Sequence, residues 1–174
     1  MPPTRAAWAT GFALQSQSDW AIYQKLADDK DVPRCHALHY LQMACEKIAK
    51  AYRCRDTAAT LDSLMSRHVG FRKFLESFLK SPTVKQAYHG HEAQRQQLAR
   101  LARKLAAGTE SLAPAVGRET SPQNAEYPWA DGDVVVAPCA FGYPDLSLLS
   151  EPGGRTFLKL VAWAIHDYDV IATH

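Results

Sequence analysis

The most regular hydrophobic pattern in the chain lies between residues 33 and 55. Its apolar positions recur every three or four residues, which places them in one stripe along a helix of 3.6 residues per turn. These positions are Leu38, Leu41, Cys45, Ile48 and Tyr52. Gln42, Glu46 and Lys50 follow another face, and Glu46 and Lys50 have the spacing of a favourable i,i+4 ion pair. The pattern predicts a long, largely buried helix.

Weaker helical patterns flank this segment. We expect residues 1–16 to form a loosely ordered arm. Ser18 and Asp19 are suited to cap a following helix, whose inward-facing residues would be Trp20, Tyr23, Leu26 and Ala27. Further helices are predicted over residues 57–67, 71–79, 83–107 and 155–171.

The stretch from residue 108 to 154 lacks helical periodicity. Residues 108–123 are rich in turn formers and predict a connector, with a helical turn at 110–113. Residues 125–129 and 133–137 predict a β-hairpin around Ala130-Asp131-Gly132, with the valines of the second strand favouring β-structure. Residues 138–154 predict a loop. We therefore expect one mainly α domain over residues 1–174, with a connector and hairpin inserted before the last helix.

Composition and charge narrow the class of protein. Of the 174 residues, 47% are hydrophobic and 22% charged, as in ordinary globular proteins, and no apolar run reaches the length of a membrane span. The N-terminus does not resemble a secretory signal. The cysteines Cys35, Cys45, Cys54 and Cys139 form no C-x-x-C pair and predict buried, reduced thiols. These features predict a cytoplasmic protein.

The net charge of +2 conceals a strong asymmetry. Residues 67–104 hold nine Lys/Arg against two Asp/Glu, whereas residues 105–174 hold three against nine. This segregation is typical of a surface for nucleic acid or for an acidic partner. Folding of the acidic part against the basic part would explain it equally well.

A family resemblance enters with residues 36–51, HALHYLQMACEKIAKA. This phrase resembles the second helix of HEPN domains, and the preceding helix is similar to their first. Glu126-Tyr127-Pro128 stands where many members have Arg-Tyr-Pro. The resemblance is strongest over residues 19–56. It implies an up-and-down helical bundle that commonly dimerises.

The resemblance also implies a role in RNA chemistry. Many HEPN proteins are metal-independent endoribonucleases of toxin–antitoxin and defence systems, and others bind RNA or nucleotides, or act as scaffolds. The catalytic members resemble one another in an Arg-x4–6-His motif, often followed by x-Tyr, at the start of the last long helix. Here the last helix retains only His166-Asp167-Tyr168, and its nearest upstream arginine is Arg155. The sole Arg-x4-His match, Arg34 to His39, lies in the second helix instead.

The predicted helix over residues 83–107 contains an anomaly. His91 and Arg95 fall within its apolar stripe, although a buried arginine is costly unless it is paired. They would form an inward-facing site in which Arg95 holds a phosphate and His91 transfers a proton. Alternatively, Gly90 breaks the helix and both side chains turn outward, or Arg95 pairs with an acidic residue of the last third.

A basic strip provides a second candidate site. Its members are Arg72, Lys73, Lys85, Arg100, Arg103 and Lys104. Such a strip suits contacts with phosphates, although solvated helix faces often have the same composition. No convincing set of metal ligands is present, and we expect neither a metal nor a cofactor.

The leading hypothesis is a non-catalytic or accessory HEPN-like protein that binds RNA, a nucleotide or a protein partner. The expected partners are such a ligand and either a second copy of the chain or another protein. One alternative is a metal-independent endoribonuclease that uses a rearranged site, either His91 with Arg95 or His166 with Tyr168. The other is a dimerising scaffold.

Overall fold

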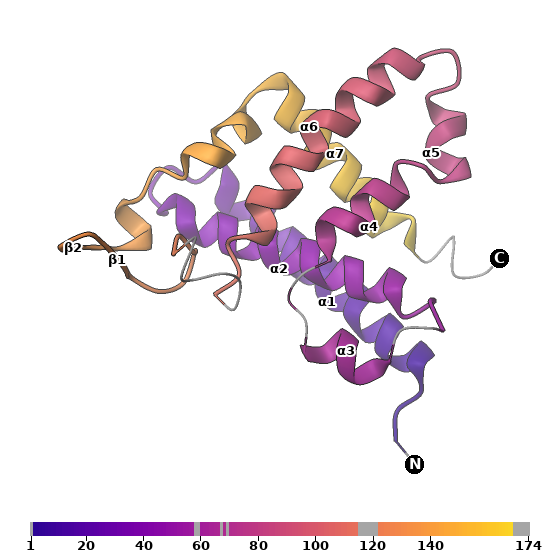
Figure 1. The fold of residues 1–174 in the computed structure, drawn as a ribbon, viewed down its shortest axis with the longest axis horizontal. Helices are drawn as coiled ribbons and strands as arrows, with labels where there is room; N and C mark the ends of the chain where they lie inside the picture. The colour runs from indigo at the N-terminus through magenta and orange to yellow at the C-terminus, as the bar shows by residue number, and fades with distance from the viewer. Residues whose placement is uncertain (1, 58–59, 67, 69, 115–121, 169–174) are drawn as a thin grey trace.

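The computed structural model describes residues 2–57, 60–66, 68, 70–114 and 122–168, and its fold is mainly α (Figure 1). Its α-helices are α1 Arg5–Ala27, α2 Arg34–Arg53, α3 Leu61–Ser66, α4 Phe71–Phe78, α5 Pro82–Ala87, α6 Glu92–Glu110 and α7 Pro152–His166. The strands β1 Trp129–Asp131 and β2 Val134–Val136 form an antiparallel hairpin, followed by the 3₁₀ helices η1 Pro138–Ala140 and η2 Pro144–Ser150. No helix in these ranges is both long and apolar enough to cross a membrane.

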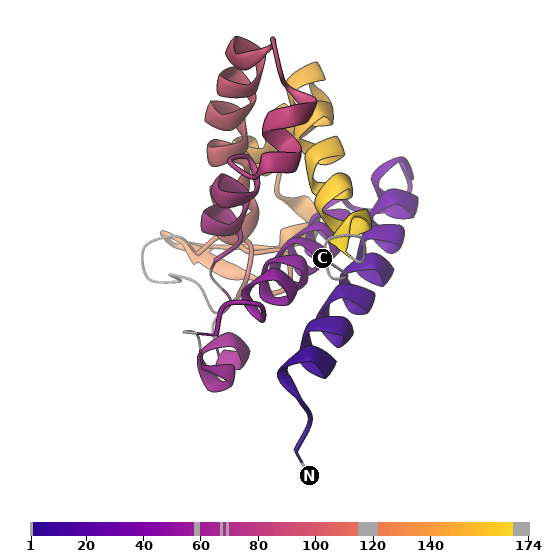
Figure 2. The ribbon, with the colours of Figure 1, turned by 90° about the vertical axis from the view of Figure 1, so that its right-hand side faces the viewer.

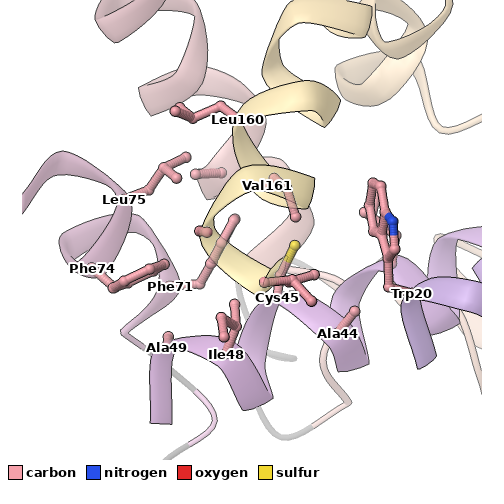
Figure 3. Close-up of a cluster of buried hydrophobic side chains, with 14 of the residues drawn as sticks. Trp20, Ala44, Cys45, Ile48, Ala49, Phe71, Phe74, Leu75, Leu160 and Val161 are labelled. Carbon is pink, nitrogen blue, oxygen red and sulfur yellow. The ribbon is translucent and has the colours of Figure 1, made fainter. Parts of the chain in front are cut away.

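Helix α2 is the centre of the core, as its pattern predicts. Leu41 and Ile48 are fully buried, together with Phe157 and Val161 of α7. Figure 3 shows how side chains of α2, α4 and α7 meet in this cluster, with Trp20 of α1 at its edge. Burial of these side chains is the main stabilising contribution to the fold.

Helix α1 corrects the prediction of an N-terminal arm. It begins at Arg5, where the side chain of Thr4 accepts a hydrogen bond from the backbone of Ala7 at 3.1 Å. It lies antiparallel to α2 in Figures 1 and 2. The hydroxyl of Ser16 donates to the carbonyl of Ala44 at 2.8 Å, so the two backbones approach closely. Trp20 and Tyr23 are buried as predicted, whereas Leu26 is half-buried and Ala27 is exposed.

The predicted helix over residues 83–107 is divided in two. Gly90 has a φ of +76°, a left-handed conformation that ends one helix before the next begins. Ser81 caps α5, and α6 continues to Glu110, beyond the predicted end. The predicted 57–67 helix is limited to α3, and residues 58–59 and 67 lie outside the described ranges.

The segment before the last helix is more structured than predicted. The strands are shorter, with Trp129 opposite Val136 and the turn at Gly132, whose φ is +60°. Two 3₁₀ helices replace most of the predicted loop, and α7 begins at Pro152 instead of Arg155. Only glycine fits at position 154, because a Cβ there would collide with the carbonyl oxygen of Leu148.

Residues 115–121 of the connector and 169–171 of the last helix lie outside the described residues. The prediction of buried thiols is correct for Cys35, Cys45 and Cys54, but Cys139 is exposed. All four thiols are free.

Candidate functional site: a basic cleft between α2, α4 and α5

A cleft of about 700 Å³ lies where the end of α2 meets α4 and the start of α5. Four cationic residues line this basic cleft, as do two acidic residues and three aromatic ones. The cations are Arg53, Arg55, Arg72 and Lys73, the acids are Asp56 and Glu110, and the aromatic residues are Tyr52, Phe74 and Phe78. Its size is within the range of ligand-binding pockets.

Three of the cations keep their charges available. Within the described residues, the side chains of Arg53, Arg72 and Lys73 form no hydrogen bond and no ion pair. Arg72 and Lys73 are exposed in the first turn of α4, and Arg53 is half-buried at the end of α2. Gly70 makes room for Arg53, since a Cβ at that position would lie 3.1 Å from Arg53 Nη1. The cleft therefore presents unpaired positive charge.

Arg55 is held differently. Its guanidinium lies over the rings of Tyr52 and Tyr168, at 4.9 and 4.4 Å from the ring centroids, and it donates to the carbonyl of Tyr168 at 2.9 Å. Such stacking fixes a guanidinium in place while leaving its remaining N–H groups free to donate. Arg55 thus contributes a rigid charge to the cleft.

The aromatic residues form an apolar wall. The rings of Tyr52 and Phe74 lie 4.7 Å apart between centroids, and Phe78 contacts the same tyrosine edge-on at 6.0 Å. Burial raises the pKa of Tyr52 to about 12, and its hydroxyl donates to the carbonyl of Ala164 at 3.1 Å. Tyr52 is therefore a neutral packing residue at physiological pH and not a base.

Glu110 neutralises the N-terminus of α4. One of its carboxylate oxygens, Oε2, accepts hydrogen bonds from the backbone N–H groups of Gly70 and Arg72, both at 3.0 Å. Exposed N–H groups at a helix start attract anions, and here the protein supplies its own. Because the backbone uses Glu110, this carboxylate pairs with none of the cleft cations.

The structure does not place His91 and Arg95 in a buried site. His91 is exposed before the first turn of α6, as expected if Gly90 breaks the helix. Arg95 is half-buried, and its Nη1 donates to the carbonyl of Leu79 at 3.3 Å, near the end of α4. The inward-facing pair predicted from helical periodicity is thus wrong, because the helix is interrupted one residue before His91.

The side chains of His166 and Tyr168 also lie in different surroundings. His166 is exposed at the end of α7, whereas Tyr168 is 4% exposed and donates to the carbonyl of Ala51. Tyr168 therefore packs inside the protein and holds Arg55.

The two predicted histidine sites are far apart. A Cβ on Gly153 would touch Leu101, so α6 and α7 cross near these residues. From this crossing His91 lies about 15 Å along α6, and His166 about 20 Å along α7. In Figures 1 and 2 the α5–α6 turn is at the upper end, while α7 descends away from it. The two histidines do not form one site within a single chain.

The predicted basic strip is divided over three helices. Arg72 and Lys73 line the cleft, whereas Lys85, Arg100 and Lys104 are exposed on α5 and α6 outside it. Arg103 is paired with Glu76 across α4 and α6 at 3.1 Å. Among the ion pairs of the described residues, none joins a basic residue of 67–104 to an acidic residue of 105–174.

Sequence patterns did not point to Arg53 and Arg55 as site residues. They end the central helix, seventeen or more residues before Arg72, and only the fold brings the two basic pairs together. One pattern could have indicated them: two basic residues at the end of one helix, followed by two more at the start of a later helix. In the described part of the chain, no group of three His, Cys, Asp or Glu residues is placed to hold a metal.

Comparisons with known proteins identify no relative of this chain. No protein-family model, curated protein or solved structure matches the chain. The HEPN resemblance of residues 19–56 therefore stays a prediction from sequence, and the functional proposal rests on the geometry of the cleft.

Proposed function

We propose that the protein binds single-stranded RNA, or another phosphate-bearing ligand, in the basic cleft. In this proposal it is a non-catalytic or accessory HEPN-like protein, and its resemblance favours a role in a defence or toxin–antitoxin system. The observation that carries the proposal is the cleft itself, where Arg53, Arg72 and Lys73 offer unpaired charges beside an aromatic wall.

The chemistry of the cleft suits a phosphodiester chain. Arginine donates in pairs to phosphate oxygens, and release of counterions from the chain supplies much of the affinity. The face of an aromatic ring or of a stacked guanidinium can accept a base without reading its sequence. Arg55 on Tyr52 is such a guanidinium, 4.9 Å from the ring centroid.

Binding can be measured with a labelled single-stranded RNA of about 12 nucleotides, by fluorescence anisotropy. The double variant Arg72→Gln/Lys73→Gln should bind about tenfold more weakly, because two phosphate contacts are lost. The matched control is Lys25→Gln/Lys30→Gln, which removes the same charge from exposed residues that do not line the basic cleft. Equal loss in both double variants would mean that net charge, and not the cleft, holds the RNA.

The alternative functions are distinguished by simple outcomes. Nuclease activity predicts RNA cleavage by clean wild-type protein in the presence of EDTA, abolished by His166→Ala or His91→Ala. The surroundings of both pairs give that alternative less support. His91 is exposed while Arg95 donates to the carbonyl of Leu79, and His166 is exposed while Tyr168 is buried. A scaffold predicts a dimer by light scattering together with no RNA affinity at any salt concentration.

A further inference from the structure

A second cleft, separate from the basic cleft, lies between α1, the start of α2, η2 and α7. Its volume is about 590 Å³, and it shares no lining residue with the basic cleft. Trp20, Tyr23, Leu38 and Leu158 contribute apolar walls. We refer to it as the tryptophan cleft. Its size is that of a site for a small molecule.

Trp20 has an unused hydrogen-bond donor. The residue is 4% exposed, and no described residue accepts a hydrogen bond from its buried Nε1–H. In Figure 3 Trp20 stands at the edge of the core cluster, with its nitrogen on the ring edge farther from Val161. Buried polar groups almost always have a partner, and an indole can only donate. Trp20, one of the residues that line the tryptophan cleft, thus has a buried donor without an acceptor among the described residues.

Tyr23 adds a second donor beside Trp20. The two rings lie 5.1 Å apart between centroids, and both line the cleft. Burial raises the pKa of Tyr23 to about 12, so its hydroxyl stays protonated and neutral at physiological pH. A neutral tyrosine hydroxyl can donate a hydrogen bond to a ligand or accept one from it.

Three cations surround the same cleft, and two of them are held in position. Arg34 donates to the carbonyls of Gly142 and Leu146 at 3.1 and 2.7 Å. Arg155 donates to the carbonyl of Ser150 at 3.0 Å. Neutral carbonyls orient these guanidiniums without neutralising them, and orientation before binding reduces its entropic cost.

Lys159 is the third cation. It is exposed, and within the described residues it has no hydrogen bond or ion pair. Asp28 is the one carboxylate among the residues that line the cleft. Three cations against one carboxylate leave an excess of positive charge beside an apolar wall.

We propose that the tryptophan cleft binds a small amphipathic anion, a molecule with an apolar body and a carboxylate or similar acidic head group. The body packs between Trp20, Leu38 and Leu158, and the head group meets Arg155 and Lys159. The body is an aromatic ring system or an acyl chain, since both have the required shape and polarity.

The test uses two fluorescent probes that differ mainly in charge. Anilinonaphthalene sulfonate has an aromatic body with an anionic group, whereas N-phenyl-1-naphthylamine has a similar body without charge. Arg155→Gln/Lys159→Gln should weaken binding of the anionic probe about tenfold and leave binding of the neutral probe unchanged. Lys159→Gln alone, which removes no contact within the described residues, should weaken it about threefold.

The control is Arg100→Gln/Lys104→Gln, the same charge change on exposed residues of α6 that line neither cleft. It should bind both probes as the wild type does. Equal weakening in this control would overturn the proposal. So would weakening of both probes to the same extent in the cleft variant, because the head group would then have no role.

The indole of Trp20 gives an independent readout. Its ¹H–¹⁵N resonance, identified by its loss in Trp20→Phe, should move when the anionic probe binds, because Trp20 lines the cleft. An unmoved resonance at saturation would place the probe elsewhere and overturn the assignment.

Competition experiments distinguish the two kinds of apolar body, an acyl chain and an aromatic ring system. Displacement of the probe by decanoate identifies an acyl ligand, and displacement by 1-naphthoate identifies an aromatic one. Displacement by neither would contradict a carboxylate-bearing ligand. Because these assays contain no RNA and alter no residue of the basic cleft, their failure leaves the proposed function untouched.

Discussion

At the scale of single residues, Glu46 is the one acidic residue of the central helix α2, and its carboxylate has three neighbours. Its carboxylate accepts from Gln42 and Lys50, both at 2.8 Å, and lies 3.1 Å from the Nδ1 of His68. Burial alone would raise the pKa of Glu46, but the hydrogen bonds and charges of these neighbours outweigh it and lower the pKa. The ionised carboxylate is therefore favoured by the folded state.

This lowered pKa predicts how stability depends on pH. A carboxyl group with a lowered folded-state pKa stabilises the fold above its ordinary value of 4.5, and this contribution disappears as the pH falls through the folded-state pKa. Glu46→Gln should lower the free energy of unfolding at pH 7 by about 2 kcal/mol, because Lys50 loses its partner. The difference between wild type and variant, measured by urea denaturation, should shrink below about pH 4.5.

Glu76→Gln is the matched control for this prediction. Glu76 also pairs with a cation, Arg103, but their side chains are 36% and 61% exposed. Exposed ion pairs contribute little, so this variant should change the free energy of unfolding by less than about 0.5 kcal/mol. A Glu46→Gln variant as stable as this control would show that the buried pair has no net effect.

At the scale of elements, α1 shows why part of the fold escaped prediction. Its apolar residues are distributed around the helix, and Gly11 interrupts them. Its buried positions are Ala9, Ala13, Ser16, Asp19, Trp20 and Tyr23, of which three are small and one is charged. Small residues permit the close approach of α1 to α2, yet they give a weak hydrophobic signal. Helix α2 could be predicted because large apolar residues form a stripe along it. Helix α1 has no such stripe, so its first half was not predicted.

Substitutions at two glycines should change the free energy of unfolding in opposite directions. Gly11 lies in α1, and a Cβ added there would meet nothing within 4 Å, so Gly11→Ala should raise the free energy of unfolding by about 0.5–1 kcal/mol. Gly70 has a φ of +140° and faces Arg53, so Gly70→Ala should lower it by about 2 kcal/mol. Urea denaturation at neutral pH measures both changes.

Gly142→Ala serves as the reference for these variants. Gly142 lies in a loop, with open space around it and no left-handed φ. The substitution should leave stability within about 0.5 kcal/mol of wild type. Stabilisation by Gly70→Ala would contradict the described backbone before α4.

The candidate site illustrates the same limit of prediction. The charge pattern drew attention to Arg72 and Lys73, which line the basic cleft, because clustered basic residues are visible in a sequence. The break at Gly90 was visible as well, but its consequence for His91 depended on the φ of one glycine, which is +76°. Only a continuous helix would bury His91 and Arg95 together, and the folded chain has two separate helices here.

At the scale of the whole molecule, the fold gathers cations from distant parts of the chain into two basic clefts. The first joins the end of α2 to α4, and the second joins the start of α2 to α7. Each therefore uses one end of the central helix. The segregation of charge along the chain is visible in the sequence, but it does not indicate these clefts. Arg53 and Arg72 line one cleft, and Arg34 and Arg155 the other, only because helices that are distant in the chain pack together.

The salt dependence of RNA binding tests the central claim most directly. The logarithm of the association constant is measured against the logarithm of salt concentration, between about 50 and 200 mM, for wild type and Arg72→Gln/Lys73→Gln. The variant should give a slope shallower by about 1.4, because each lost phosphate contact removes about 0.7 from the slope for a single strand. Equal slopes for the two proteins would show that Arg72 and Lys73 do not contact phosphates, and would contradict the basic cleft as the binding site.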